Sequence, residues 1–115
     1  MPPTVVFNEG DLLRRLMGDR QLAGVVVQGF LDEAPSLLSN LRKRLDEEDA
    51  NGVRSQAHTI RGASATVAAE GLHAIAEQME LAGKAGQLDR CRELLPRAVE
   101  ELQRFRSALE RAGWV

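Results

Sequence analysis

The 115-residue chain has one cysteine, Cys91, no tyrosine, and only three phenylalanines and one tryptophan. A lone cysteine excludes a disulfide framework within the chain and suits a reducing environment. The scarcity of aromatic side chains leaves the core to Leu, Ala and Val, a composition that favours packed helices over a sheet. With 43% hydrophobic residues a chain of this length can bury a core. We therefore expect one domain over residues 1–115, structured from about 7 to 112.

A strong charge of one sign is also lacking. The 15 Lys and Arg residues are interleaved with 17 Asp and Glu residues, for a net charge of -2, whereas nucleic-acid binders usually carry a basic patch. The longest apolar run, around Val25, is far too short to span a membrane. The start of the chain, Met1-Pro2-Pro3-Thr4, has no basic region followed by an apolar run, so we expect no signal peptide. These features predict a cytoplasmic protein that binds neither nucleic acid nor membrane.

What the chain does have is hydrophobic residues at spacings of three and four along five segments, without the alternation typical of strands. We predict helices at about 8–17, 19–47, 50–69, 71–85 and 88–112. The expected N-caps are Asn8, Asp19 and Asp49. The expected stops are Gly18, Gly86 and Gly113. Four long amphipathic segments with short turns predict an all-α fold: an antiparallel up-down four-helix bundle with a short additional N-terminal helix.

Two prolines fall inside these segments. Pro35 lies within the second segment, where we expect a bend rather than a break. Pro96 lies within the last segment and predicts either a kink or the true start of that helix.

The third segment carries the strongest functional signal. On a helical wheel of about 100° per residue, one apolar stripe lies within roughly 40° of a common direction, which we take as the buried face. The stripe consists of Val53, Ala57, Ile60, Ser64 and Val67. His58 lies about 140° from that stripe and should therefore be exposed. The residues predicted to share its face are Arg54, Arg61, Gly62, Ala65 and Ala69.

Gly62 is unexpected in mid-helix, because glycine there costs about 1 kcal/mol relative to alanine. One interpretation is that a small residue beside His58 lets a second protein approach the imidazole. The alternative is that His58 is an ordinary surface histidine and Gly62 serves close packing. Ser64 lies on the apolar stripe, where we expect its hydroxyl to bond back to helix carbonyls.

The run Ala57-His58-Thr59-Ile60-Arg61-Gly62-Ala63-Ser64-Ala65 resembles the signature of the histidine-containing phosphotransfer (HPt) family, His-x-Leu-Lys-Gly-x-Ser/Ala. Leu72 and the pair Met79-Glu80 stand where the family has an apolar residue and Leu-Glu. The stretches 16–19 and 30–35 also look like the leading helices of such domains. The resemblance extends from about Phe7 to Leu109.

This resemblance implies a role for each matching position. His58 matches the phosphorylated histidine, Arg61 the lysine that assists the phosphoryl group, and Gly62 the glycine that lets the partner approach. Glu80 matches a polar residue that holds the imidazole, and Lys84 a position that is sometimes basic. The chain departs from the family in having Arg in place of Lys at 61, which changes reach and geometry. It also has Ala68 where the family often has Gly, so the resemblance does not fix the residue at which the third helix ends.

The resemblance further implies a phosphocarrier, not an enzyme with autokinase activity, since no Gly-rich nucleotide loop is present in the sequence. Expected partners are response-regulator receiver domains and, as a further candidate, a hybrid sensor histidine kinase. We expect no bound cofactor, with Mg²⁺ supplied by the receiver, and a monomer.

Two other functions stay open at this stage. A non-catalytic helical adaptor would leave His58 incidental. A metal-binding bundle could use His73, Glu77 and Glu80 by spacing alone, although mixed His and Glu residues are common on solvated faces and no further ligand cluster is present in the sequence. We interpret His73 as structural or solvent-exposed.

Overall fold

The computed structural model describes residues 6–115, which form five α-helices and no strand. The all-α class is therefore confirmed for this part of the chain. The helices are α1 (Glu9–Arg15), α2 (Arg20–Asp46), α3 (Ala50–Thr66), α4 (Glu70–Lys84) and α5 (Leu88–Arg111). The expectation about a signal peptide concerns Met1-Pro2-Pro3-Thr4, which lies outside the described residues. No helix within 6–115 is long and apolar enough to cross a membrane.

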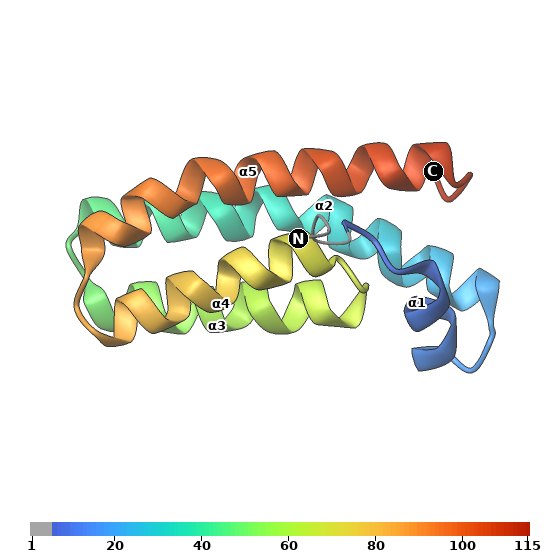
Figure 1. The fold of residues 1–115 in the computed structure, drawn as a ribbon, viewed down its shortest axis with the longest axis horizontal. Coiled ribbons are helices and arrows are strands. Elements are labelled where there is room, and N and C mark those ends of the chain that lie inside the picture. Colours follow the sequence, from blue (N-terminus) through green and yellow to red (C-terminus); the bar gives the residue numbers. More distant parts are fainter. Residues whose placement is uncertain (1–5) are drawn as a thin grey trace, which may run out of the picture.

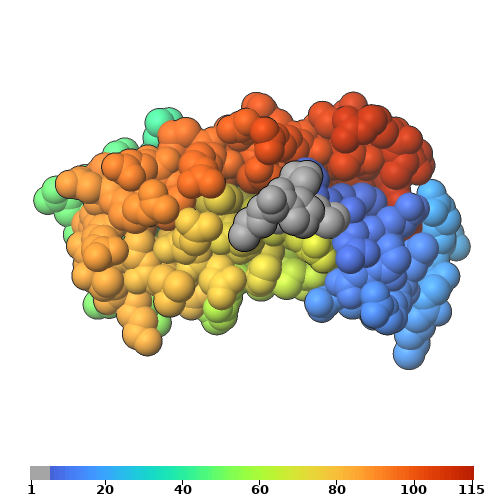
Figure 2. Space-filling view, viewed as in Figure 1, coloured from blue at the N-terminus to red at the C-terminus, as the bar shows by residue number. Residues whose placement is uncertain are grey.

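The four long helices lie side by side along the longest axis of the molecule, and α1 lies near the start of α2 (Figure 1). Three-residue turns join α2 to α3, α3 to α4 and α4 to α5. The contact between α3 and α4 is the most extensive, and each also packs against one more long helix, α2 or α5 respectively. The contact between α2 and α5 is smaller. In the space-filling view α4 and α5 lie side by side, with α1 toward one end of the molecule (Figure 2).

The core is aliphatic along most of its length and aromatic at one end. Leu41, Leu45, Leu72 and Leu94 are fully or almost fully buried. At the other end Phe105 meets Phe7 and Phe30 edge-on, with ring centroids 5.5 and 5.6 Å apart. Edge-to-face pairs of this kind add stability beyond the area they bury. The few aromatic residues are thus concentrated where α1, α2 and α5 meet.

The two ends of the described chain are bound to each other. Trp114 donates from Nε1 to Glu9 Oε1 at 2.9 Å, and the Arg20 guanidinium lies 4.1 Å from the centre of the Trp114 ring. The Asn8 backbone N–H donates to the Ala68 carbonyl at 3.1 Å. These contacts hold α1 against α5 and against the turn between α3 and α4.

The predicted N-caps are confirmed. The side chains of Asn8, Asp19 and Asp49 accept hydrogen bonds from the backbone of Asp11, Leu22 and Gly52. Such bonds satisfy amide groups that have no partner within the helix. The N-cap positions of α4 and α5, Ala69 and Gln87, make no side-chain capping bond.

The helix ends differ in part from the prediction. Each helix closes with the paired hydrogen bonds of a Schellman motif, which places one residue in the left-handed conformation. Glycine takes that place after α4 and α5, at Gly86 and Gly113 as predicted. After α1 two successive residues take it, Met17 with φ 58° and the predicted Gly18 with φ 76°. α3 ends at Thr66 instead of the predicted 69, because Ala68 turns the chain with φ 56°.

Both prolines lie inside helices. α2 continues from Arg20 to Asp46 through Pro35, so the expectation that Pro35 does not break the helix is confirmed. α5 begins at Leu88, so the interpretation of Pro96 as the start of the last helix is wrong.

Candidate functional site

The apolar face of α3 determines where His58 points. Val53, Ala57 and Ile60 are at most 1% exposed, and they hold that face against the other long helices. The His58 side chain, on the other side of α3, is 62% exposed. The predicted accessibility of His58 is therefore confirmed.

Ser64 lies on the buried face, as predicted, and is fully buried. Its hydroxyl lies 2.7 Å from the Ile60 carbonyl and 3.0 Å from the Arg61 carbonyl. The hydroxyl is thus satisfied within its own helix, and Ser64 plays no part in the exposed site.

Glu80 from α4 holds the His58 ring. The Glu80 carboxylate is only 18% exposed, and its Oε2 lies 3.0 Å from His58 Nδ1. A carboxylate can only accept, so Nδ1 carries the proton and donates to Oε2. The neutral imidazole then has its lone pair on Nε2, which makes no hydrogen bond in the described part of the chain.

Arg61 completes the group from the next turn of α3. Its Nε lies 3.1 Å from Glu80 Oε1, and its Nη2 lies 3.2 Å from His58 Nδ1. With Nδ1 protonated, the contact of Nη2 with Nδ1 joins two donors and is not a hydrogen bond. Glu80 Oε1 is buried and has no hydrogen-bond partner in the described part of the chain, so Arg61 meets it as an ion pair. Arg61 therefore balances the carboxylate that orients the ring.

Gly62 leaves open space beside His58. A Cβ built at Gly62 would meet no atom within 4 Å, so the glycine does not serve helix packing. Gly62 is exposed, and it lies four residues after His58 in α3, one turn along the helix. The packing interpretation of Gly62 is therefore wrong for the fold of this chain.

Two other residues expected near His58 behave differently. Lys84, at the end of α4, is exposed, and no hydrogen bond or ion pair within residues 6–115 joins it to His58. Ala69 is fully buried and precedes α4, so its predicted place on the exposed face is wrong. The cause is the left-handed turn at Ala68, which ends the helical periodicity that the wheel assumed.

His73, the second histidine, is partly buried between α3 and α4. Its Nδ1–H donates to the Arg61 carbonyl at 3.2 Å. The spacing-based metal hypothesis grouped His73 with Glu77 and Glu80, but Glu80 is engaged with His58 and Arg61. No group of three or more His, Cys, Asp or Glu residues suited to a metal ion occurs between residues 6 and 115. His73 links the two helices at the level of Arg61.

Gly83 is a residue that the sequence analysis missed. It is buried in α4, three residues after Glu80, and a Cβ there would lie 3.0 Å from the Arg54 backbone N. The sequence feature that could have indicated it is a glycine one helical turn after Glu80, the predicted partner of His58.

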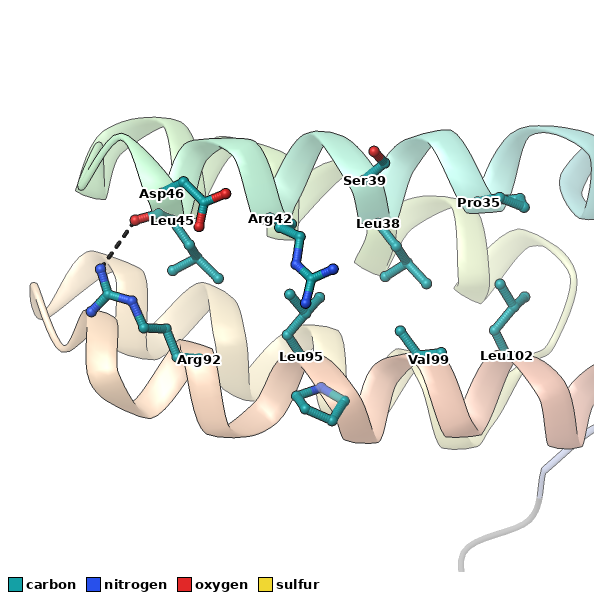
Figure 3. A pocket seen from close by; sticks show the side chains of 11 residues that line it. Pro35, Leu38, Ser39, Arg42, Leu45, Asp46, Arg92, Leu95, Val99 and Leu102 are labelled. Atoms are coloured by element: carbon teal, nitrogen blue, oxygen red, sulfur yellow. Dashed lines mark hydrogen bonds between the residues drawn. The ribbon is translucent and has the colours of Figure 1, made fainter.

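A groove of about 750 Å³ lies between α2 and α5 (Figure 3). Leu38, Leu95 and Leu102 line it, and Arg92 donates to the Leu45 carbonyl at 3.1 Å at one end. His58, on the pair of helices formed by α3 and α4, is not among its lining residues. The groove is therefore separate from the exposed histidine.

Comparison with known proteins finds one matching family model and two solved structures of similar fold. A family model described as the Hpt domain matches residues 25–111. Histidine-containing phosphotransfer protein B of Pseudomonas aeruginosa PAO1 superposes with a TM-score of 0.85 at 20% identity, over 93% of each chain. The HPT domain of a sensor hybrid histidine kinase from Shewanella superposes with a TM-score of 0.78 at 19% identity, over 93% of this chain and 92% of that one.

These structural likenesses, at such low identity, show a shared fold. No curated protein sequence matches the chain. The family model covers well over half of the sequence, His58 and Glu80 included. On this evidence the chain belongs to the Hpt domain family.

Proposed function

We propose that this chain is a phosphocarrier that accepts a phosphoryl group on His58 from an aspartate of one receiver domain and passes it to an aspartate of another. The observation that carries the proposal is an exposed histidine ring whose Nδ1 is bonded to Glu80, while Nε2 makes no hydrogen bond within residues 6–115. We also interpret the four long helices as the antiparallel up-down bundle predicted from the sequence. That scaffold would present the ring on the side of α3 and α4.

The transfer step needs only one nucleophile from this chain. The Nε2 lone pair of His58 would attack phosphorus, forming the N–P bond as the O–P bond to the aspartate breaks. The electron pair of that bond returns to the aspartate carboxylate. The Nδ1 proton stays on the ring, and Glu80 compensates the positive charge that develops there. The reverse sequence returns the phosphoryl group to the next receiver.

Arg61 and Gly62 would serve the approach of the receiver. The Arg61 guanidinium lies next to the ring and is about one-third exposed, so it can turn toward phosphoryl oxygens. Gly62 leaves room for a partner backbone beside the imidazole. The exposed Lys84 would add positive charge one turn beyond Glu80. Phosphoryl transfer depends mainly on such positioning and charge neutralisation.

The receiver would supply Mg²⁺ and the aspartate, and we assign no residue of this chain to a cofactor. We propose receiver domains, and a hybrid sensor kinase as a further candidate, as partners of a monomeric carrier. The proposed role includes no transfer from ATP.

Substitution of His58 by Gln tests the function. Incubation with a receiver phosphorylated on aspartate should label the wild-type chain with acid-labile, base-stable phosphate and should leave His58→Gln unlabelled. His73→Gln is the matched control, because a Gln amide can still donate to the Arg61 carbonyl, and it should be labelled normally.

Labelling of His58→Gln would refute the proposal. An adaptor would behave differently, since it would bind its partners equally well with or without His58. Pull-down of a receiver by both chains, without any labelling of the wild type, would therefore favour the adaptor.

A further inference from the structure

α3 and α4 contact each other at three levels along their length. The Arg61 carbonyl meets His73, His58 meets Glu80, and the Arg54 backbone meets Gly83. The partner number in α4 rises as the number in α3 falls, so these two helices run in opposite directions. The contact between His58 and Glu80 therefore lies between two other points at which the helices touch.

The contact at Gly83 leaves too little room for a side chain. A Cβ at Gly83 would lie 3.0 Å from Arg54 N, 3.2 Å from Arg54 Cα and 3.3 Å from Val53 Cγ1. Two of these atoms belong to the α3 backbone, which cannot rotate away as a flexible side chain can. A methyl group at position 83 must therefore push α4 away from α3 by a few tenths of an ångström.

The contact between Gly83 and Arg54 lies close to His58 along both helices. Gly83 follows Glu80 by three residues, and Arg54 precedes His58 by four, so each is one turn from the reactive pair. Glu80 cannot easily make up for a shift of α4, because its carboxylate is largely buried and its Oε1 is paired with Arg61. The 3.0 Å distance from Glu80 Oε2 to His58 Nδ1 thus depends on how closely the helices approach at Gly83.

We propose that Gly83 is a positioning residue that sets the distance between Glu80 and His58 and thereby keeps the proton of the neutral ring on Nδ1. This role differs from that of Gly62, which is exposed and where a Cβ would meet no atom within 4 Å. The kinetic part of the inference rests on the proposed function, whereas the effect on the ring does not.

The test compares Gly83→Ala with Gly29→Ala as the matched control, because Gly29 is an exposed glycine of α2 where a Cβ would meet no atom within 4 Å. Nitrogen NMR of the neutral His58 ring should give the Nδ1–H tautomer for the wild type and for Gly29→Ala. Gly83→Ala should give a mixture with the Nε2–H tautomer. Phosphate uptake by Gly83→Ala should slow by about threefold to tenfold, the scale expected for a displacement well below 1 Å. Circular dichroism confirms that each variant is folded.

A double-mutant cycle separates positioning from general damage to the fold. If Gly83 acts through Glu80, Gly83→Ala should slow uptake in the wild-type background and have no further effect in Glu80→Ala. An equal slowing in both backgrounds, or an unchanged tautomer in Gly83→Ala, would overturn the proposal. A chain that unfolds on this substitution is measured in trimethylamine N-oxide, which favours the folded state. If the wild type takes up no phosphate, the proposed function fails while the tautomer still decides the role of Gly83.

Discussion

Single residues define the chemistry proposed for this chain. Glu80 bonds Nδ1 of His58, Arg61 balances the Glu80 carboxylate, and Gly62 keeps the space beside the ring free. Of these four residues only His58 presents an exposed nitrogen that can act as the nucleophile, because Glu80 is largely buried and paired and Arg61 is cationic. Substitution of any of the other three should therefore change the rate of transfer without abolishing it.

Arg61→Ala should slow transfer without abolishing it. A charge-assisted interaction worth about 1.5–3 kcal/mol corresponds to a slowing of roughly tenfold to a hundredfold. Arg61→Lys should recover much of the rate, because an ammonium can still pair with Glu80 or with the phosphoryl group. Rapid-quench transfer from a phosphorylated receiver measures each variant, and an unchanged rate in Arg61→Ala would reduce Arg61 to an ordinary surface charge.

Gly62→Ala should raise the free energy of unfolding by about 1 kcal/mol, because alanine favours the helix and the new methyl group meets no atom. Gly62→Gln should slow transfer by occupying the space next to His58. Urea unfolding and the transfer assay measure the two effects separately. Equal transfer rates for wild type and Gly62→Gln would contradict a docking role for this glycine.

At the scale of helices, the local signals of the sequence were sufficient for the starts and insufficient for some of the ends. Asn8, Asp19 and Asp49 cap their helices because a short polar side chain reaches back to the first turn. Ala68 and Glu48 take the left-handed conformation although neither residue type favours it. Packing of the neighbouring helices imposes these turns, so no local pattern could reveal them.

Glu48→Gly should stabilise the fold. Glu48 ends α2 with φ 54°, and its side chain is 77% exposed, so little is lost when the side chain is removed. Relief of the left-handed strain, less the entropy that glycine adds to the unfolded chain, should give about 0.5–1 kcal/mol. Glu48→Ala is the control, because it removes the same carboxylate and keeps the strain. Equal stability of the two variants in urea would contradict the strain at this turn.

At the scale of the whole molecule, the sequence indicated the helical class and His58, but not the distances between helices. The family signature pointed to Glu80 as a partner of the ring, and the structure brings the two within 3.0 Å. The close approach at Gly83 and the bond from His73 to the Arg61 carbonyl depend on how α4 lies against α3. Such contacts between distant segments produce no periodic pattern in the sequence, so they cannot be predicted from it.

Cys91 offers a probe of the whole fold. It is fully buried against α4, and this burial raises the pKa of its thiol, with Arg92 opposing the effect in part. Less thiolate is therefore present at a given pH than in the unfolded chain, where the pKa is lower. Labelling by a disulfide reagent at pH 8 should be at least about a thousandfold slower in the native protein than in urea. Rapid native labelling would show that α5 opens without unfolding of the rest.

The exposed position of His58 has a consequence for the order in which donor and acceptor bind in the proposed relay. A ring that stands on an open surface, with one reactive nitrogen, can be covered by one receiver at a time. The donor must leave before the acceptor can bind, as in a ping-pong scheme. Throughput would then depend on how quickly each spent partner dissociates, and two acceptors in the same cell would compete for every phosphorylated copy of the carrier.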